Sequence, residues 1–191
     1  MKENLYELSE SFKNMSEFLP YDKDEYYIKA QKRCSKLLKK IDKLYFYQDK
    51  KRNKLFKKLF KEYGENNTIK EGFVCNLGSN IKIGNGCFFN FNTIILDSYS
   101  VEIGNNVFIA PNVIISPVEH SITAKERQKN RGGKIVIEDD VWIGAGAIIL
   151  PNVTLHKGCV IGAGSIVRTD VEANTVYAGV PAKFIKTIDN N

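Results

Sequence analysis

Two histidines are the side chains of this chain best suited to acid–base chemistry, because an imidazole exchanges a proton near neutral pH. His120 lies in a polar segment, residues 117–134, where it could take the proton of an attacking hydroxyl group. A positioned base typically contributes roughly 10²–10⁴-fold to a rate. His156 follows Leu155 within a regular repeat, so we expect it at the surface. His120 is therefore the candidate general base, and a loop histidine without a role is the alternative.

The four cysteines form neither a C-x-x-C pair nor a regular metal-binding spacing. Cys75, Cys87 and Cys159 each stand two residues before an aliphatic residue of a repeat, where we expect small buried side chains. Together with Cys34 they are interpreted as reduced thiols. A zinc enzyme with three histidine ligands would need one more histidine than the chain has. We expect no metal.

A six-residue period carries the main structural signal. Aliphatic or aromatic residues recur at Leu77, Ile83, Phe89 and Ile95, after a two-residue slip at Ile103, Ile109 and Ile115, and after residues 117–134 at Ile137, Ile143, Ile149, Leu155, Ile161 and Val167. Hexapeptide repeats are typical of a parallel β-helix, in which three short strands close one triangular coil. Because strand side chains alternate, the residue two positions earlier also points inward. Residues 117–134 are the long break in this period, and such loops are usually functional.

The chain before the repeats predicts helices. Apolar residues at helical spacing mark three segments, carried by Leu5, Leu8 and Phe12, by Tyr27, Cys34, Leu37, Leu38, Ile41, Leu44 and Tyr45, and by Leu55, Phe56, Leu59, Phe60 and Tyr63. Asp22 or Asp24 would cap the second helix, and Gly64 would end the third. The expected organisation is a helical segment over residues 1–66, a β-helix over 67–175 and a tail over 176–191.

The net charge of +6 is concentrated at one end. Residues 1–70 hold 18 Lys and Arg against 11 Asp and Glu, whereas the remainder holds 10 against 11. A solvated helix face is the plainest account, since no nucleic-acid-binding module is recognisable. No apolar run is long enough to cross a bilayer, and the first residues lack an apolar signal segment, so we expect a cytoplasmic protein that binds neither membrane nor nucleic acid.

Four stretches within the repeats are more specific: FFNFNTIILD (88–97), IGNNVFIAPNVII (103–115), DDVWIGAGAIILPNVTL (139–155) and GCVIGAGSIVRTDVEANTVYAGVPAKFIK (158–186). With the loop HSITAKER (120–127), they resemble the maltose and galactoside O-acetyltransferases of the hexapeptide acyltransferases. The resemblance implies a left-handed β-helix with an N-terminal α-helical arm, acetyl-CoA as donor, and a homotrimer whose active sites lie between subunits.

The resemblance assigns the reacting groups. His120 would be the general base, and Asn90 would help to bind and polarise the reacting groups, although a corner asparagine in a polar ladder is the alternative. Trp142 would line the active-site tunnel. Because Trp142 precedes the inward Ile143, strand alternation independently predicts that it faces outward.

Acetyl-CoA, the donor, would lie along small residues of the repeats and extend to the tail over residues 176–191. Ala145 and Ala163 would leave room for the pantetheine arm of acetyl-CoA, and Lys183 or Lys186 would meet a coenzyme phosphate unless both are simply solvated. The backbone amide that stabilises the tetrahedral intermediate is not identifiable from the sequence.

The acceptor side departs from the family. Asp22 and Arg127 match acceptor-side positions, with helix capping as an equal account of Asp22, whereas Phe88 replaces a tyrosine. Gln31 replaces an arginine and Ser98 an aspartate. We therefore expect acetyl transfer to a hydroxyl of a sugar or sugar-like acceptor that need not be a galactoside.

Two other functions compete with this interpretation. A xenobiotic (antibiotic) acetyltransferase uses the same base on the same fold, but generally lacks the N-terminal helical arm. A non-catalytic β-helix scaffold would need neither His120 nor Asn90.

Overall fold

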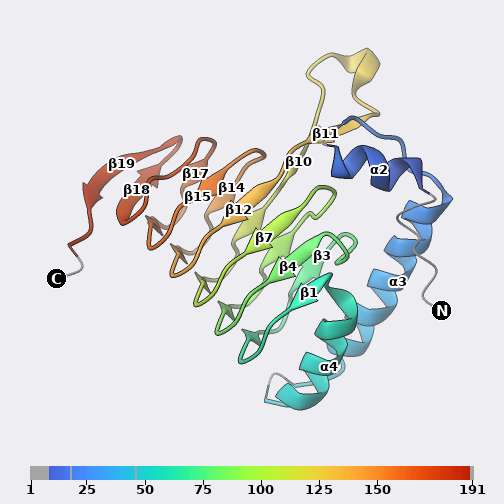
Figure 1. Ribbon diagram of the computed structural model, residues 1–191, viewed down its shortest axis with the longest axis horizontal. Coiled ribbons are helices and arrows are strands. Elements are labelled where there is room, and N and C mark those ends of the chain that lie inside the picture. Colours follow the sequence, from blue (N-terminus) through green and yellow to red (C-terminus); the bar gives the residue numbers. More distant parts are fainter. Residues whose placement is uncertain (1–8, 18, 46, 190–191) are drawn as a thin grey trace.

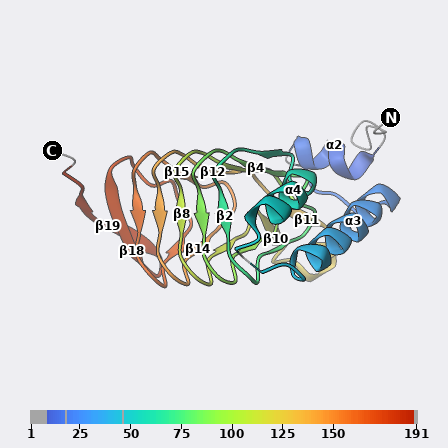
Figure 2. The ribbon, with the colours of Figure 1, turned by 90° about the horizontal axis from the view of Figure 1, so that it is seen from below.

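The computed structural model describes residues 9–17, 19–45 and 47–189, and shows a parallel β-helix with helices packed at its N-terminal end (Figures 1 and 2). The helices are α2 (Glu10–Ser16), α3 (Glu25–Ile41) and α4 (Asp49–Leu59). Ser9 caps α2, and the Asp24 carboxylate caps α3 by accepting the N–H of Tyr27 at 2.9 Å. The part of the first helical prediction carried by Leu5 and Leu8 lies outside the described residues.

The predicted third helix was too long. The α4 helix ends at Leu59, Phe60 has an extended backbone, and Tyr63 lies in a strand opposite Ile83. The backbone N–H of Lys61 already bonds to the carbonyl of Ile81. Helix and strand periods both place an apolar residue near this point, and pairing with the next coil decides in favour of the strand. Gly64 therefore follows a strand and does not end a helix.

Three parallel sheets form the sides of the triangular coil. Sheet I consists of β1 (Glu62–Tyr63), β4 (Ile81–Ile83), β7 (Val101–Ile103), β12 (Ile135–Ile137) and β15 (Thr154–Leu155). Sheet II consists of β2 (Thr68–Ile69), β5 (Phe88–Phe89), β8 (Phe108–Ile109), β13 (Trp142–Ile143), β16 (Val160–Ile161), β18 (Thr175–Gly179) and the antiparallel β19 (Ala182–Thr187). Sheet III consists of β3 (Val74–Cys75), β6 (Ile94–Ile95), β9 (Ile114–Ile115), β14 (Ile148–Ile149) and β17 (Ile166–Val167).

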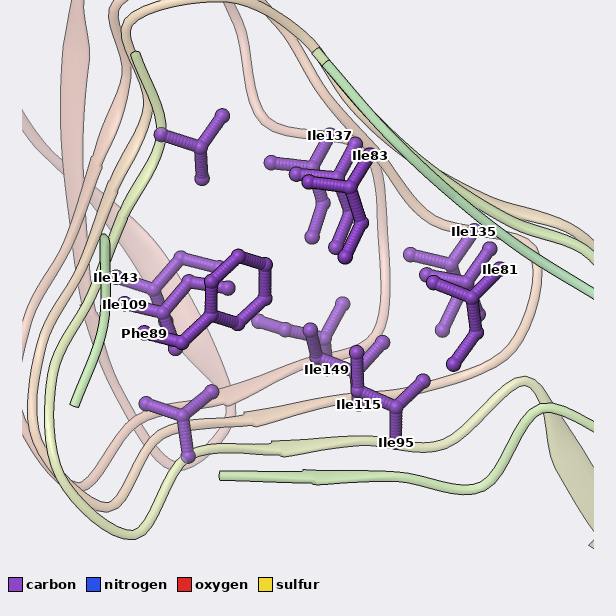
Figure 3. Close-up of a cluster of buried hydrophobic side chains, with 14 of the residues drawn as sticks. Ile81, Ile83, Phe89, Ile95, Ile109, Ile115, Ile135, Ile137, Ile143 and Ile149 are labelled. Atoms are coloured by element: carbon purple, nitrogen blue, oxygen red, sulfur yellow. The ribbon is translucent and has the colours of Figure 1, made fainter. Parts of the chain in front are cut away.

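Stacked aliphatic side chains fill the interior (Figure 3). Phe89, Ile109 and Ile143 pair in register and form one column, and the sheets contribute further columns of the same kind. These side chains are fully buried, so the inward positions predicted from the period are confirmed from Ile81 onward. The mainly β class, a parallel β-helix of hexapeptide repeats with an N-terminal helical arm, is also confirmed.

The predicted phase of the first coil was wrong. Cys75 pairs with Ile95, so it occupies the aliphatic position and not the small one, whereas Cys87 and Cys159 do occupy the small position. Leu77 is buried outside the coil, because the two-residue slip already occurs after Cys75. All four cysteines are free and buried. The Sγ atoms of Cys34 and Cys75 are 3.5 Å apart.

The slip enlarges one edge of the prism, which we call edge III–I because there sheet III continues into sheet I. Residues 76–80, 97–100 and 116–134 all emerge at this edge. The N-terminal arm packs on it through a second apolar cluster made of Phe12, Met15, Tyr21, Tyr27, Ala30, Leu77 and Tyr99. The arm therefore supports the base of the 117–134 loop, whose Val118 packs against this cluster.

Candidate active site

His120 ends strand β10 (Val118–His120), which forms an antiparallel hairpin with β11 (Asn130–Gly132). The imidazole is exposed, and its Nδ1 lies 2.9 Å from the backbone carbonyl oxygen of Arg127. A carbonyl only accepts hydrogen bonds, so this contact places the proton of a neutral imidazole on Nδ1. The Nε2 atom then carries the free lone pair and can accept a proton.

Arg127 shapes the turn that carries this base. Its guanidinium donates to the carbonyl of Ile122 at 2.8 Å and, more weakly, to that of Ser121 at 3.4 Å. The 3-10 turn η1 (Ala124–Glu126) lies between Ile122 and Arg127 in the chain. The side chain predicted to contact the acceptor thus binds its own loop, while its backbone orients His120.

Asp22 lies beside the same hairpin. Tyr21 bridges to Asn130, the cross-strand partner of His120, with its backbone N–H 3.2 Å from the Asn130 carbonyl. Asp24 caps α3, so the capping account of Asp22 does not hold. Among the residues described, no hydrogen bond or ion pair involves the exposed Asp22 carboxylate. We call Asp22, His120 and Arg127 the base group.

The other predicted residues gather at a different edge, edge II–III, where sheet II continues into sheet III. Phe88 and Trp142 both pair with Phe108, so the three outward rings form one row across sheet II. Trp142 is 54% exposed, which confirms its outward orientation. Sequence reasoning missed Phe108, which is 53% exposed and whose ring centroid lies 6.1 Å from that of Phe88. An aromatic residue at an outward strand position was the signal available for it.

Asn90 follows β5 at edge II–III. Its side-chain oxygen accepts the backbone N–H of Phe91 at 2.8 Å, and its backbone carbonyl accepts the Thr93 hydroxyl at 2.9 Å. Within the described part of the chain, no acceptor is assigned to its side-chain NH₂ group. The polar ladder is instead formed by Asn92 and Asn112. The Asn90 amide is therefore free to donate to a ligand oxygen.

Small residues continue this edge toward the C-terminus. Ala145 and Ala163 follow Gly144 and Gly162, both of which must be glycine because a Cβ would meet atoms of the next coil at 2.6–2.7 Å. The β18–β19 hairpin comes next, with Lys183 opposite Ala178 and Lys186 opposite Val176. Both lysines are exposed. We call Phe88, Asn90, Trp142, Ala145 and Ala163 the edge group.

One chain does not bring the two groups together. The base group lies at edge III–I and the edge group at edge II–III, and the width of sheet III separates these edges. One hexapeptide spans that width, roughly 15–20 Å at the rise of a β-strand. The predicted residues therefore do not form one cluster within a single chain.

The acceptor-side positions that depart from the family form a neutral network. The Gln31 side chain donates to the Asn76 oxygen at 2.8 Å, and the Asn76 NH₂ group lies 3.1 Å from the Ser98 hydroxyl. Asn76 also bonds to the Tyr27 hydroxyl at 2.6 Å. The two replacements are thus linked through one asparagine.

A buried carboxylate lies directly beside this network. Asp97 accepts the backbone N–H groups of Asn76 and Leu77 at 2.9 and 2.8 Å and that of Asn80 at 3.3 Å. Burial raises the pKa of Asp97 to about 7, against the lowering effect of these hydrogen bonds. Its three donors close the turn at residues 76–80, so we assign it a structural role.

His156 follows β15 at the corner where sheet I continues into sheet II, away from both groups, with Nδ1 3.1 Å from a Glu138 carboxylate oxygen. In the described ranges, no group of three or more His, Cys, Asp or Glu residues is arranged to hold a metal ion. Likewise, no helix among the described residues is long and apolar enough to cross a membrane.

The repeats match two family models, "Bacterial transferase hexapeptide (six repeats)" over residues 134–169 and "Hexapeptide repeat of succinyl-transferase" over residues 80–117. These matches define the class as hexapeptide-repeat transferases. The galactoside O-acetyltransferase of Lactococcus lactis subsp. lactis is 36% identical over 186 residues, which cover 95% of this chain and 90% of the relative.

Two solved structures share the whole architecture. A maltose O-acetyltransferase from Clostridium difficile 630 superposes with a TM-score of 0.90 at 36% identity, covering 95% of this chain and 98% of that one. A galactoside acetyltransferase in complex with coenzyme A also gives 0.90, at 34% identity, covering 95% and 92%. The chain belongs to the galactoside and maltose O-acetyltransferase family. It is an acyltransferase and not the non-catalytic scaffold considered as an alternative.

Proposed function

We propose that this enzyme transfers the acetyl group of acetyl-CoA to a hydroxyl of a sugar or sugar-like acceptor, with His120 as general base, at sites between the subunits of a homotrimer. The observation that carries the proposal is the hydrogen bond between His120 Nδ1 and the Arg127 carbonyl. It leaves Nε2 as the proton acceptor. The coenzyme A complex of a relative with the same architecture supports the choice of donor.

The chemistry follows from this geometry. His120 Nε2 takes the acceptor's hydroxyl proton while the oxygen attacks the thioester carbonyl, and the resulting imidazolium returns that proton to the departing coenzyme thiolate. The Arg127 carbonyl stabilises the imidazolium through the Nδ1–H group. The Asn90 NH₂ group would donate to an oxygen of the reacting groups, where a preorganised dipole is most effective.

The donor side fits an extended thiol arm. The small side chains at edge II–III allow a narrow chain to lie close to the backbone, and Trp142 offers a ring face beside it. Lys183 and Lys186 lie on the terminal hairpin, where an ammonium group would meet a coenzyme phosphate as a point charge.

The outward faces of the prism favour a trimer. The outward residues of sheet III are all aliphatic: Val74, Ile94, Ile114, Ile148 and Ile166. Those of sheet II include Phe88, Phe108, Trp142, Val160 and Val176. Packing sheet III of one subunit against sheet II of the next would bury both rows. It would also bring the base group of one subunit toward the edge group of its neighbour.

The general base is tested by His120→Ala. We expect coenzyme thiol release in the presence of a sugar acceptor to fall by roughly 10²–10⁴-fold, because proton removal no longer accompanies attack. His120 is exposed, so the unfolding midpoint should not change. Unchanged acetyl transfer in the variant would overturn the assignment.

A panel of sugars tests the class of acceptor. A clear preference for thiogalactosides over all other sugars would contradict an acceptor pocket that differs from that of the galactoside enzymes.

Mixed trimers test the composite site. We expect His120→Ala and Asn90→Ala to be nearly inactive alone. When the two variants are coexpressed, about one site in four should receive an intact histidine from one subunit and an intact asparagine from the next, assuming random assembly of a cyclic trimer. Activity near a quarter of the wild-type value is expected. If the mixture stays as inactive as its parents, both groups act within one chain or in another arrangement.

A further inference from the structure

The helix pair α3–α4 carries a charge unlike that of the rest of the molecule. Residues 25–59 contain 13 Lys and Arg and only 3 Asp and Glu, a net charge of +10, whereas all other residues together have a net charge of −4. The two helices lie side by side at the N-terminal end of the β-helix (Figures 1 and 2). The whole positive excess of the protein is therefore confined to this pair.

Part of this charge converges on one concave site. A groove of about 700 Å³ between the helices is lined by Lys29, Lys32, Arg33, Lys36, Leu37, Lys57 and Lys58. Six of these seven side chains are cationic and none is acidic. A solvated helix face spreads its cations around a convex surface, whereas a concave wall of one sign concentrates the potential.

The local carboxylates leave most of this charge unbalanced. Glu25 pairs with Lys29 at 3.6 Å, and Glu65 pairs with Lys57 at 2.6 Å. The other four cations of the groove, Lys32, Arg33, Lys36 and Lys58, have no carboxylate partner within the described ranges. Bringing like charges together is costly unless an anion neutralises them.

Arg33 is held in place at the groove. Its guanidinium donates to the backbone carbonyls of Lys58 and Leu59, at the end of α4 where the helix dipole is negative. This link fixes α3 against α4, so the groove is formed before any ligand arrives. Remaining guanidinium donors and three lysine ammonium groups can then face an anion.

We propose that this groove binds a small molecule carrying two or more phosphate groups, at a site separate from the donor and acceptor sites. The number of unpaired cations calls for a multivalent anion. The volume lies in the range of small-molecule sites, and a concave groove between two helices does not match a flat bilayer. The catalytic residues lie elsewhere, at edges III–I and II–III.

Inorganic tripolyphosphate is the probe. Titration calorimetry on the whole protein should show saturable binding at one site per chain. The variant Lys32→Gln/Lys36→Gln removes two groove cations and should weaken binding roughly ten- to hundredfold, because each lost charge-assisted contact has a large effect. The matched control, Lys39→Gln/Lys54→Gln, removes the same charge from exposed positions of the same helices outside the groove and should change the dissociation constant less than about threefold.

Each remaining outcome counts against the site. Absence of saturable binding, or equal weakening in both variants, would show only diffuse attraction. Tripolyphosphate binding that coenzyme A displaces and that Lys32→Gln/Lys36→Gln leaves unchanged would place the probe in the donor site. Binding of the protein to anionic vesicles or RNA that depends on Lys32 and Lys36, without binding of tripolyphosphate, would assign the groove to another class of partner. Unchanged coenzyme A affinity and circular dichroism in both variants verify the fold.

Discussion

Sheet I and sheet III are built from the same repeat, yet they present opposite faces to their surroundings. On sheet I, Lys82 lies 3.2 Å from Glu62 and 3.7 Å from Glu102, whose second carboxylate oxygen lies 2.6 Å from Lys134. On sheet III the corresponding row is aliphatic from β3 to β17. The inward columns of both sheets are equally buried.

The difference shows that separate constraints determine the residues at the inward and the outward strand positions. The inward residue must fill the coil, so it is aliphatic on every side. The outward residue is free to suit water or another protein surface, and a contiguous apolar row marks an interaction face. Sheet I is therefore the solvent face of the prism, and sheet III is the face that the proposed trimer would cover.

The largest effect is expected on the outward face of sheet III. Ile114→Lys places an ammonium group in the middle of the aliphatic row of sheet III, where burial against a neighbour would cost several kcal/mol. We expect light scattering to show monomers and acetyl transfer to be lost. Val136→Lys on sheet I is the matched control, because Val136 is also an outward, half-buried aliphatic residue. A trimer that survives Ile114→Lys would remove sheet III from the interface.

A smaller effect is expected at edge III–I, where the two faces meet. Near pH 4, before ionisation of Asp97 contributes, Asp97→Asn removes one of the acceptors for the N–H groups of residues 76–80 and should lower the free energy of unfolding by about 1–3 kcal/mol. Urea denaturation measures this. The same loss in a variant at an exposed carboxylate such as Asp22 would show that the effect is not specific to the buried turn.

The pH dependence of Asp97 has a definite sign. Burial raises the pKa of Asp97 to about 7 from its ordinary 3.8, so between these values the native state binds more protons than the unfolded state. The free energy of unfolding should therefore fall as pH rises through this window, by at most about 1.4 kcal/mol per pH unit, and level off above it. Asp97→Asn should lack this component. Identical slopes in both proteins would mean that Asp97 is ionised throughout.

The smallest effect is expected on the solvent face. Lys82→Met breaks the ion pairs with Glu62 and Glu102, yet we expect a loss of no more than about 1 kcal/mol, because exposed pairs are screened by water. Urea denaturation at low and high salt checks this, and the difference between the proteins should shrink with salt. A loss of several kcal/mol would mean that sheet I is also buried in an assembly.

Much of the fold was predictable because the hexapeptide period is local and repeated. Spacing alone assigns inward residues such as Phe89, Ile109 and Ile143, which do stack inside the coil. The period fails at the first coil, where Leu77 lies six residues before Ile83 but packs against the helical arm. It fails again at Tyr63, where helix and strand periods overlap. In both places a contact with a distant segment decides the outcome.

The sequence could propose members of the candidate site but not their arrangement. His120 was recognisable as the histidine in the long break of the repeat, and Trp142 as an outward aromatic residue. Nothing local indicated that Arg127 would bind its own loop, because a guanidinium suits an acceptor equally well. The distribution of the residues over two edges of the prism also became visible only in the assembled coil.

The sequence alone determined the repeat, the inward columns and the candidate base, because each depends on residue types at short, regular spacing. Tertiary structure decided the tautomer of His120, the phase of the first coil and the separation of the base group from the edge group. Those features depend on which segments lie side by side after each full turn of the coil. Such contacts join residues that are far apart in the sequence. The positive charge of residues 25–59 could also be counted in the sequence. Only the packing of the helices places part of this charge around one groove.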